Sequence, residues 1–477
     1  MNKSNDLLGA DEHHDQTFLK TDSAKMTYGN SSSRYENTPN GGVKSFLPIP
    51  VILFLLAFIV PIHFFIGPLR LTGLRIILLI LIVPMIINLI KGKYGKILFV
   101  DYVFFLHFLW VAFAILVNDP RQFLQSIGAT GIDFIGGYMI GRAYIRNIIS
   151  FQKLAATLVL IAFCTLPFAI YEAYTGHAII VETIRNLPGI TSVNPLTDAW
   201  YHRVRLGLYR TQVFAAHPIH YGFFAASIFS LSYIALRNFY STKLRLLLSF
   251  SVGMCVFFSL SSGPLLGMTV QLGLISWAFV FQKLSRPWLM LTGVIIAVYI
   301  FVDILSERPP ILVFLAYASL SPSTAYGRYM IFEWGMKNVW SSPIIGIGSA
   351  DWERAWFMSG SMDNFWLLIM MRYGVPAFLF LVSGWFWALW KVGQRNFNSD
   401  STLCSLRRAW VISSISVSFI LASVHVWDAM YSFVFFLFGA GIWLMTVEPQ
   451  YGQCDLNSDL ERKPILPYTR FPKRSIS

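Results

Sequence analysis

The chain has 477 residues and a formal net charge of +13, but only 13% of its residues are charged and 55% are hydrophobic. A soluble globular chain carries roughly 25% charged residues, so this composition excludes an ordinary cytosolic enzyme as well as a disordered or collagen-like chain. It indicates an all-α, polytopic integral membrane protein, and the positive charge does not predict a nucleic-acid partner.

The chain divides into two polar ends and one apolar middle. Residues 1–45 are polar, mixed in charge and without an apolar period, which predicts a disordered tail and not a signal peptide. A second tail is expected over 448–477. The middle, 46–447, offers about twelve runs long enough to cross a bilayer, because a transmembrane helix needs about 20 largely apolar residues. The runs are 46–67, 71–90, 97–117, 123–141, 154–175, 217–236, 245–260, 264–282, 287–304, 365–390, 409–427 and 429–447.

The basic residues predict which side each loop faces. Alternate short loops carry clusters of Lys and Arg, and such loops face the cytoplasm. The intervening short loops offer little beyond Arg70 and Arg121. Both termini are therefore expected in the cytoplasm, and the basic clusters include Lys91, Lys93 and Lys96, Arg142 and Arg146, Lys283 and Arg286, and Arg407 and Arg408.

Two expected outer loops are long, 176–216 and 305–364. Long irregular segments in a compact domain are usually functional or disordered. Their aromatic content argues against disorder, and the short apolar stretch Pro310–Leu320 predicts an interfacial or re-entrant piece. The aromatic residues include Trp200, Tyr201, Trp340, Trp352 and Trp356.

The first loop ends in a group of candidate binding residues. Arg210 precedes His217 and His220 at the start of the sixth run. A cation and two imidazoles at a membrane face suit an anionic head group. The alternative is that Arg210 reaches a lipid phosphate and the histidines only cap the helix.

The second loop carries aromatic and charged residues at near-helical spacing between Arg328 and Trp340. This pattern predicts a helix, which could simply lie on the membrane with its cations at lipid head groups. The Gly346-x-Gly348 pair predicts a turn. The Tyr373-Gly374-Val-Pro376 stretch predicts a kink between a half-helix that starts near Asp363 and a full span.

Charged residues inside the apolar runs are secondary candidates, since charges within a membrane are costly and often functional. They are Asp101, Asp133, Glu172 and Arg142. The alternative is that they pair between helices. Spacings typical of metal ligands are not found, so no metal is predicted.

These segments together resemble the signature of the O-antigen ligase/polymerase family. The resemblance spans most of residues 130–440. Two positions depart from the family pattern, because Asp363 stands where the family has histidine and Ser261-Ser262-Gly263 replaces a Ser-Arg-Gly. Both departures favour an exopolysaccharide polymerase over a ligase. The matching positions are Arg210, Phe214 and Pro218, Gly141-Arg142, Arg328 and Trp334, Pro343 with Gly346 and Gly348, Asp363-Asn364-x-x-Leu367, and Tyr373-Gly374-Val-Pro376.

The resemblance implies a glycosyltransferase of the bacterial inner membrane, which polymerises repeat units carried on undecaprenyl pyrophosphate at the outer face. It implies pyrophosphate binding by Arg210 and Arg328 and catalysis by Asp363, His217 or His220, with no cofactor. Trp334, Asn364 and Arg142 are expected in supporting roles. Expected partners are membrane lipids, the lipid-linked glycan, a flippase, and chain-length or export proteins.

Three other functions remain open. A ligase would pass the same glycan to a lipid A core. Twelve spans with both ends inside also fit a transporter or flippase, although the chain lacks the internal repeat common in transporters. A non-catalytic scaffold of a secretion apparatus is the third.

Overall fold

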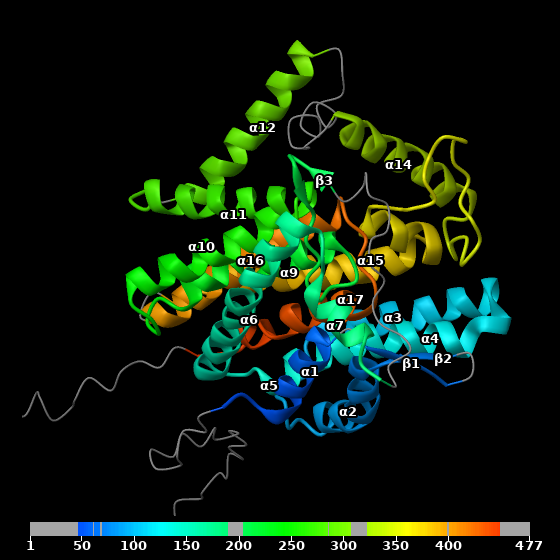
Figure 1. Ribbon diagram of the computed structural model, residues 1–477, viewed down its shortest axis with the longest axis horizontal. Helices are drawn as coiled ribbons and strands as arrows, with labels where there is room; N and C mark the ends of the chain where they lie inside the picture. The colour runs from blue at the N-terminus through cyan, green and yellow to red at the C-terminus, as the bar shows by residue number, and fades with distance from the viewer. Residues whose placement is uncertain are drawn as a thin grey trace, which may run out of the picture. The chain divides into compact units, whose positions relative to one another are not determined.

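The computed structural model describes residues 46–60, 62–66, 69–188, 204–284, 286–306, 322–397 and 400–448 (Figure 1). The tails expected over 1–45 and 448–477, apart from Glu448, lie outside these residues. The same holds for Trp200, Tyr201 and the Pro310–Leu320 stretch.

The described chain is mostly helical. Eight of its helical segments are long and apolar enough to cross a bilayer, which confirms the all-α membrane class but not the predicted count of twelve spans. They are α2 (Gly73–Ile90), α3 (Phe99–Asn118), α6 (Ile148–Thr175), α11 (Ser262–Val280), α12 (Pro287–Leu305), α15 (Phe365–Gln394), α16 (Ser401–Leu421), and α17 (Asp428–Gly439) with the short η4 (Ile442–Met445).

The other predicted runs form shorter or interrupted helices. Two of them contain a turn of π-helix, and such turns often occur at functional sites. One π-turn carries Asp133. These elements are α1 (Ile49–Ile59), α4 (Phe123–Gly131) with η2 (Ile132–Gly136) and α5 (Gly137–Tyr144), α9 (Pro218–Ser230) with η3 (Leu231–Ala235), and α10 (Thr242–Phe258). The remaining helices are η1 (Pro120–Gln122), α7 (Ile179–Arg185) and α14 (Pro322–Ser341).

The first predicted span, 46–67, is wrong in its second half. Helix α1 ends at Ile59, and the chain then forms strand β1 (His63–Ile66), which pairs with the antiparallel strand β2 (Leu69–Thr72). Val60 has the extended dihedral angles φ −84° and ψ 111°. A residue before proline is disfavoured in the helical region, so Pro61 accounts for the early end of α1.

Helix α15 turns back sharply at Gly374, where φ is +84°. The Trp366 ring lies 5.9 Å from the Trp385 ring, whereas an uninterrupted helix would separate these residues by about 28 Å. Both indole N–H groups donate to Ser418, one to its carbonyl oxygen at 3.1 Å and one to its hydroxyl at 2.8 Å. The predicted kink is thus confirmed, and the half-helix before Gly374 folds against the span that follows it.

The apolar core is centred on α17, which packs against α5. Two glycines allow the backbones to approach, because a Cβ on Gly141 would lie 2.2 Å from the Phe436 carbonyl oxygen and one on Gly439 would lie 2.3 Å from that of Tyr138. Small residues serve the same purpose in other membrane helix pairs. Helix α12 differs, since none of its residues is buried.

Candidate functional site

Three arginines converge on the turn between α10 and α11, residues 259–262. Arg205 donates to the Leu260 carbonyl oxygen at 3.0 Å, and Arg210 donates to the Ser261 hydroxyl at 2.9 Å. Arg328 donates to the Ser262 hydroxyl at 3.1 Å. The three side chains, called the arginine cluster below, come from both long loops and meet on a third segment.

A β-hairpin presents the first two arginines. Strand β3 (Val204–Arg205) pairs with β4 (Leu208–Tyr209) through the two-residue turn Leu206-Gly207. Both turn residues have positive φ, 55° and 78°, as tight two-residue hairpin turns of the I′ type require. Arg210 follows β4 directly, so the hairpin fixes its distance from Arg205.

Glu172 holds the chain just beyond Arg210. Its carboxylate, buried near the end of α6, accepts hydrogen bonds from the backbone N–H groups of Gln212 at 3.0 Å and Val213 at 2.9 Å. A buried carboxylate is tolerable only when it is satisfied in this way. Glu172 therefore positions the segment that follows Arg210.

Helix α14 carries Arg328, and the predicted helix over 328–340 is confirmed. Trp334 lies further along α14 and packs, partly buried, in an apolar cluster with Leu367 and Met371 of the half-helix. The Lys337 ammonium lies 4.1 Å from the centre of the Trp334 ring. Trp334 thus packs α14 against α15, and its supporting role in the site stays a prediction.

Asp363 acts on two members of the arginine cluster. Burial lowers the pKa of Arg210 to about 10, with a further lowering by Arg205, while the Asp363 carboxylate opposes this change. Burial also lowers the pKa of Arg328, and Asp363 again opposes the change. The structure therefore brings Arg210, Arg328 and Asp363 together as one group of residues.

Asp363 does not cap the half-helix, although aspartate is a common residue at the start of a helix. The N-cap is Asn364, whose side-chain oxygen accepts from the Leu367 N–H at 3.1 Å. Asp363 lies one residue earlier, is only partly buried, and accepts a hydrogen bond from the Ser361 hydroxyl at 2.7 Å. The supporting residue Asn364 therefore takes the capping role and leaves the Asp363 carboxylate for other contacts.

The two histidines occupy different positions. His217 caps α9, because its Nδ1 accepts from the Ile219 N–H at 3.1 Å; the alternative capping role is confirmed for this residue. Burial, Arg210 and Arg205 together lower the pKa of His217 to about 4. His220 is buried, with its ring 3.9 Å from that of Trp427.

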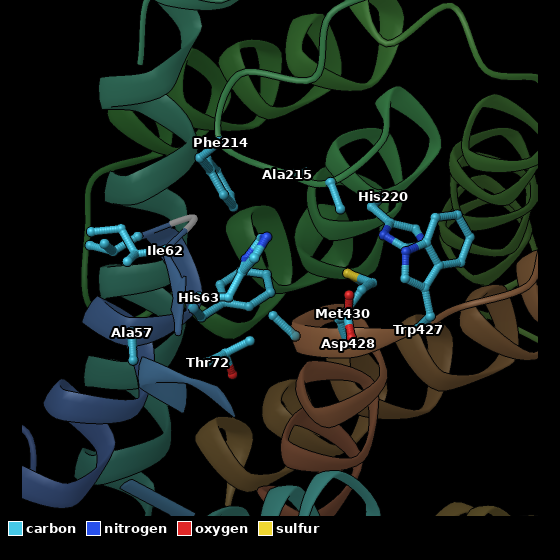
Figure 2. A pocket seen from close by; sticks show the side chains of 14 residues that line it. Ala57, Ile62, His63, Thr72, Phe214, Ala215, His220, Trp427, Asp428 and Met430 are labelled. Carbon is cyan, nitrogen blue, oxygen red and sulfur yellow. The ribbon is translucent and has the colours of Figure 1, made fainter. Parts of the chain in front are cut away.

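A cavity of about 40 Å³ lies beside these histidines, between α1, the β1–β2 hairpin, the segment after Arg210 and the start of α17. Figure 2 shows His220 and Trp427 side by side at one edge, with Asp428 and Met430 nearby and His63 across from them. A water needs about 10–15 Å³ on this measure. The cavity therefore has room for about three waters and not for a sugar.

Arg142 lies away from the arginine cluster, and its predicted supporting role stays a prediction. It donates to the carbonyl oxygens of Tyr94 and Lys96, both at 3.0 Å, and its Nε lies 3.4 Å from Asp101. It precedes α6, whose 28 residues extend about 42 Å, and Glu172 near the far end of α6 supports the segment after Arg210.

The other charges within the apolar runs are also paired. Asp133 accepts from Arg75 at 2.6 Å, and the same guanidinium lies 3.3 Å from Asp428. Asp101 accepts from the Tyr138 hydroxyl at 2.5 Å. Pairing between helices, the alternative role for these residues, therefore describes Asp101, Asp133 and Arg142.

Two of the segments that resemble the family pattern, residues 343–348 and 371–375, contact each other through their backbones. The Ile347 N–H donates to the Met371 carbonyl oxygen at 2.9 Å, and the Gly348 N–H donates to that of Arg372 at 3.0 Å. Val375 completes the contact by donating to Pro343 at 2.8 Å. The predicted turn at 346–348 is confirmed, and it anchors the second loop on the reversal of α15.

Sequence reasoning missed Arg205, Arg372 and His425. Arg205 is a second cation in the same loop as Arg210, and Arg372 is a charge in a predicted span; either signal could have identified them. His425, in the connection between α16 and α17, also lies in a predicted span, 409–427, and carried the same signal. Neither a protein-family model nor a curated protein matches the chain, so the family resemblance rests on the residues themselves.

Proposed function

We propose that the chain is a membrane glycosyltransferase that polymerises glycan repeat units carried on undecaprenyl pyrophosphate. One observation carries the proposal: Arg205, Arg210 and Arg328 meet on one turn beside the carboxylate of Asp363. Arginine binds phosphate oxygens with two parallel hydrogen bonds. A diphosphate therefore fits the arginine cluster, and a sugar attached to it would reach Asp363.

In the proposed reaction an acceptor hydroxyl attacks the anomeric carbon of the donor glycan. The new C–O bond forms as the bond to the diphosphate breaks, and the diphosphate leaves with the electron pair. The Asp363 carboxylate takes the hydroxyl proton, as a general base does. Preorganised cations in a partly dry site stabilise the charge that develops on the leaving group, and the activated donor needs neither nucleotide nor metal.

The proposal includes the bacterial inner membrane, twelve crossings and cytoplasmic termini. The arrangement of basic residues along the chain supports this orientation. The reporter fusions that test it join alkaline phosphatase, which is active outside the cytoplasm, at Ser349 and at Ser458. Activity is expected at Ser349 and not at Ser458, and the reverse pattern would contradict the orientation.

The decisive experiment replaces Arg210 and Arg328 with alanine or lysine in purified protein supplied with lipid-linked repeat units. Polymer should be lost in both alanine variants and recovered poorly by lysine, which keeps the charge but not the paired hydrogen bonds. Arg121→Ala, an exposed arginine on a short loop, is the control and should leave polymer unchanged. Normal polymer from both alanine variants at equal abundance would overturn the proposal.

Ligation to lipid A core uses the same cluster and carboxylate, so the acceptor distinguishes it. Supplying lipid A core in place of a second repeat unit should give no product if the chain is a polymerase. Transport is tested separately, because a flippase moves lipid-linked units without joining them.

A further inference from the structure

Arg372 is a second candidate for anion binding, apart from the arginine cluster. It lies at the end of the half-helix, two residues before the reversal at Gly374, and its side chain is partly buried. Among the residues that the structure describes, its guanidinium makes no hydrogen bond and no ion pair. A cation in a partly dry place without a counter-charge is costly unless a ligand supplies one.

The backbone of Arg372 is held rigidly. Its carbonyl oxygen accepts from Gly348, and the neighbouring Met371 accepts from Ile347. Gly374 cannot carry a side chain, since a Cβ there would lie 1.9 Å from the Ile344 carbonyl oxygen. These backbone contacts fix the point on the half-helix from which the Arg372 side chain projects.

The face of the half-helix that carries Arg372 is turned toward α17. Phe365, Ile369 and Arg372 follow one another at spacings of four and three residues, so they share one face. The Phe365 ring lies 5.9 Å from the Tyr431 ring on α17. The connection that leads into α17 contains His425, and the positive charge of Arg372 lowers the pKa of this residue.

His425 also has an unsatisfied polar atom. Its Nδ1 is buried without a hydrogen-bond partner in the described chain. Burial and Arg372 lower the pKa of His425 to about 4, so the ring is neutral at pH 7 and can donate one N–H. An anion between the Arg372 guanidinium and this imidazole would satisfy both groups.

An aromatic wall joins this place to the arginine cluster. Trp427 is its centre, with the His425 ring at 5.6 Å, the His220 ring at 3.9 Å and the His217 ring at 6.1 Å. His217 lies next to the cluster, since the charges of Arg210 and Arg205 both act on it. Two cationic places therefore lie at the two ends of one row of aromatic rings.

We propose that Arg372 and His425 form a second anion subsite, which binds the phosphate groups of a lipid-linked acceptor. The inference rests on the proposed function and deepens it, because joining two lipid-linked units requires one diphosphate place for each. The half-helix from Asp363 to Arg372 extends about 13 Å. This spacing leaves the reacting sugars between the two diphosphates and beside Asp363.

The test counts binding sites for farnesyl diphosphate on the full chain in phosphatidylcholine nanodiscs, by isothermal titration calorimetry. Wild type should bind two equivalents, and Arg372→Gln should bind one. Arg372→Lys should keep the second site but weaken it roughly ten- to one-hundred-fold, because the paired hydrogen bonds are lost. Arg354→Gln is the matched control, since Arg354 is already paired with Asp351 at 2.6 Å, and should bind two.

Two equivalents of unchanged affinity in Arg372→Gln would overturn the subsite. Loss of the second equivalent from wild type in phosphatidylglycerol nanodiscs would identify a lipid head group as the occupant and overturn the assignment to an acceptor. Arg210→Gln reports on the proposed function independently. If it still binds two equivalents, the arginine cluster is not a diphosphate site, whatever the result for Arg372.

Discussion

Gly374 and Ile344 are in such close backbone contact that no side chain fits between them. A Cβ on Gly374 would lie 1.9 Å from the Ile344 carbonyl oxygen, and φ at Gly374 is +84°. The contact joins the reversal of α15 to the second long loop, and it therefore holds Asp363 and Arg328 in a fixed relation.

Gly374→Ala should consequently destabilise the protein by several kcal/mol and lower its yield in membranes, because both the backbone strain and the clash oppose folding. Thermal unfolding in detergent measures the effect. Gly393→Ala on the same helix is the control: nothing lies within 4 Å of its added Cβ, and alanine favours a helix by about 1 kcal/mol over glycine. An unchanged melting temperature for Gly374→Ala would contradict the described reversal.

Asp363 and Asn364 should differ in what their substitutions remove. Asp363→Asn is expected to abolish polymer, with a rate loss of about 10²–10⁴-fold for a missing general base, while stability stays unchanged. Asp363→Glu and Asp363→His should retain part of the activity. Asn364→Ala loses the helix cap and should cost about 1 kcal/mol of stability. Normal rates from Asp363→Asn would transfer the role of base to His217 or His220.

Ser261 and Ser262 should matter through the arginines that they orient. Ser261→Ala removes the acceptor of Arg210, and Ser262→Ala removes that of Arg328. Loss of either hydrogen bond should reduce the free energy of donor binding by about 1 kcal/mol. This corresponds to roughly five-fold weaker binding and is measured as a higher KM. Ser383→Ala is the control, because that hydroxyl only bonds within its own helix. A wild-type KM in all three variants would mean that donor binding does not depend on the hydrogen bonds from the arginines to these serines.

His217 should make stability depend on pH. Its pKa falls from 6.5 to about 4 on folding, so between these values the unfolded chain binds the additional proton. The contribution of neutral His217 to the free energy of unfolding is complete above pH 6.5 and is lost as the pH falls toward 4. This contribution is at most about 3 kcal/mol.

His217→Asn, which keeps a capping side chain, should flatten the fall in melting temperature between pH 6.5 and 4. His177→Asn is the control, since that side chain is 66% exposed. Identical pH curves for wild type and His217→Asn would show that His217 is protonated as easily in the folded chain as in the unfolded one.

Hydropathy alone predicted where most helices lie, because an apolar run and a glycine or proline are local signals. The early end of α1 was also readable in principle from Pro61. The sharpness of the turn at Gly374 could not be predicted in this way. It depends on backbone hydrogen bonds between the turn and a distant segment that contains Pro343 and Gly348.

Two of the three arginines of the cluster were predicted from the sequence, but Arg205 and the geometry of the cluster were not. Arg210 and Arg328 meet through Ser261 and Ser262, which belong to a third segment and which the sequence marked only as a departure from the family pattern. The motif position of Arg142 likewise carried no information on its location, which is on α5, before the start of α6.

The shortness of α1 has a consequence for the surrounding lipid. Its 11 residues reach only about 17 Å, whereas the hydrocarbon layer is about 30 Å thick. Leu53 and Leu56 are exposed on its outer side, and a helix too short for the hydrocarbon layer is expected to thin the bilayer around it. We expect such a dimple to draw head groups inward beside the protein, which for the proposed lipid-linked donor would shorten the distance to a cation below the membrane surface.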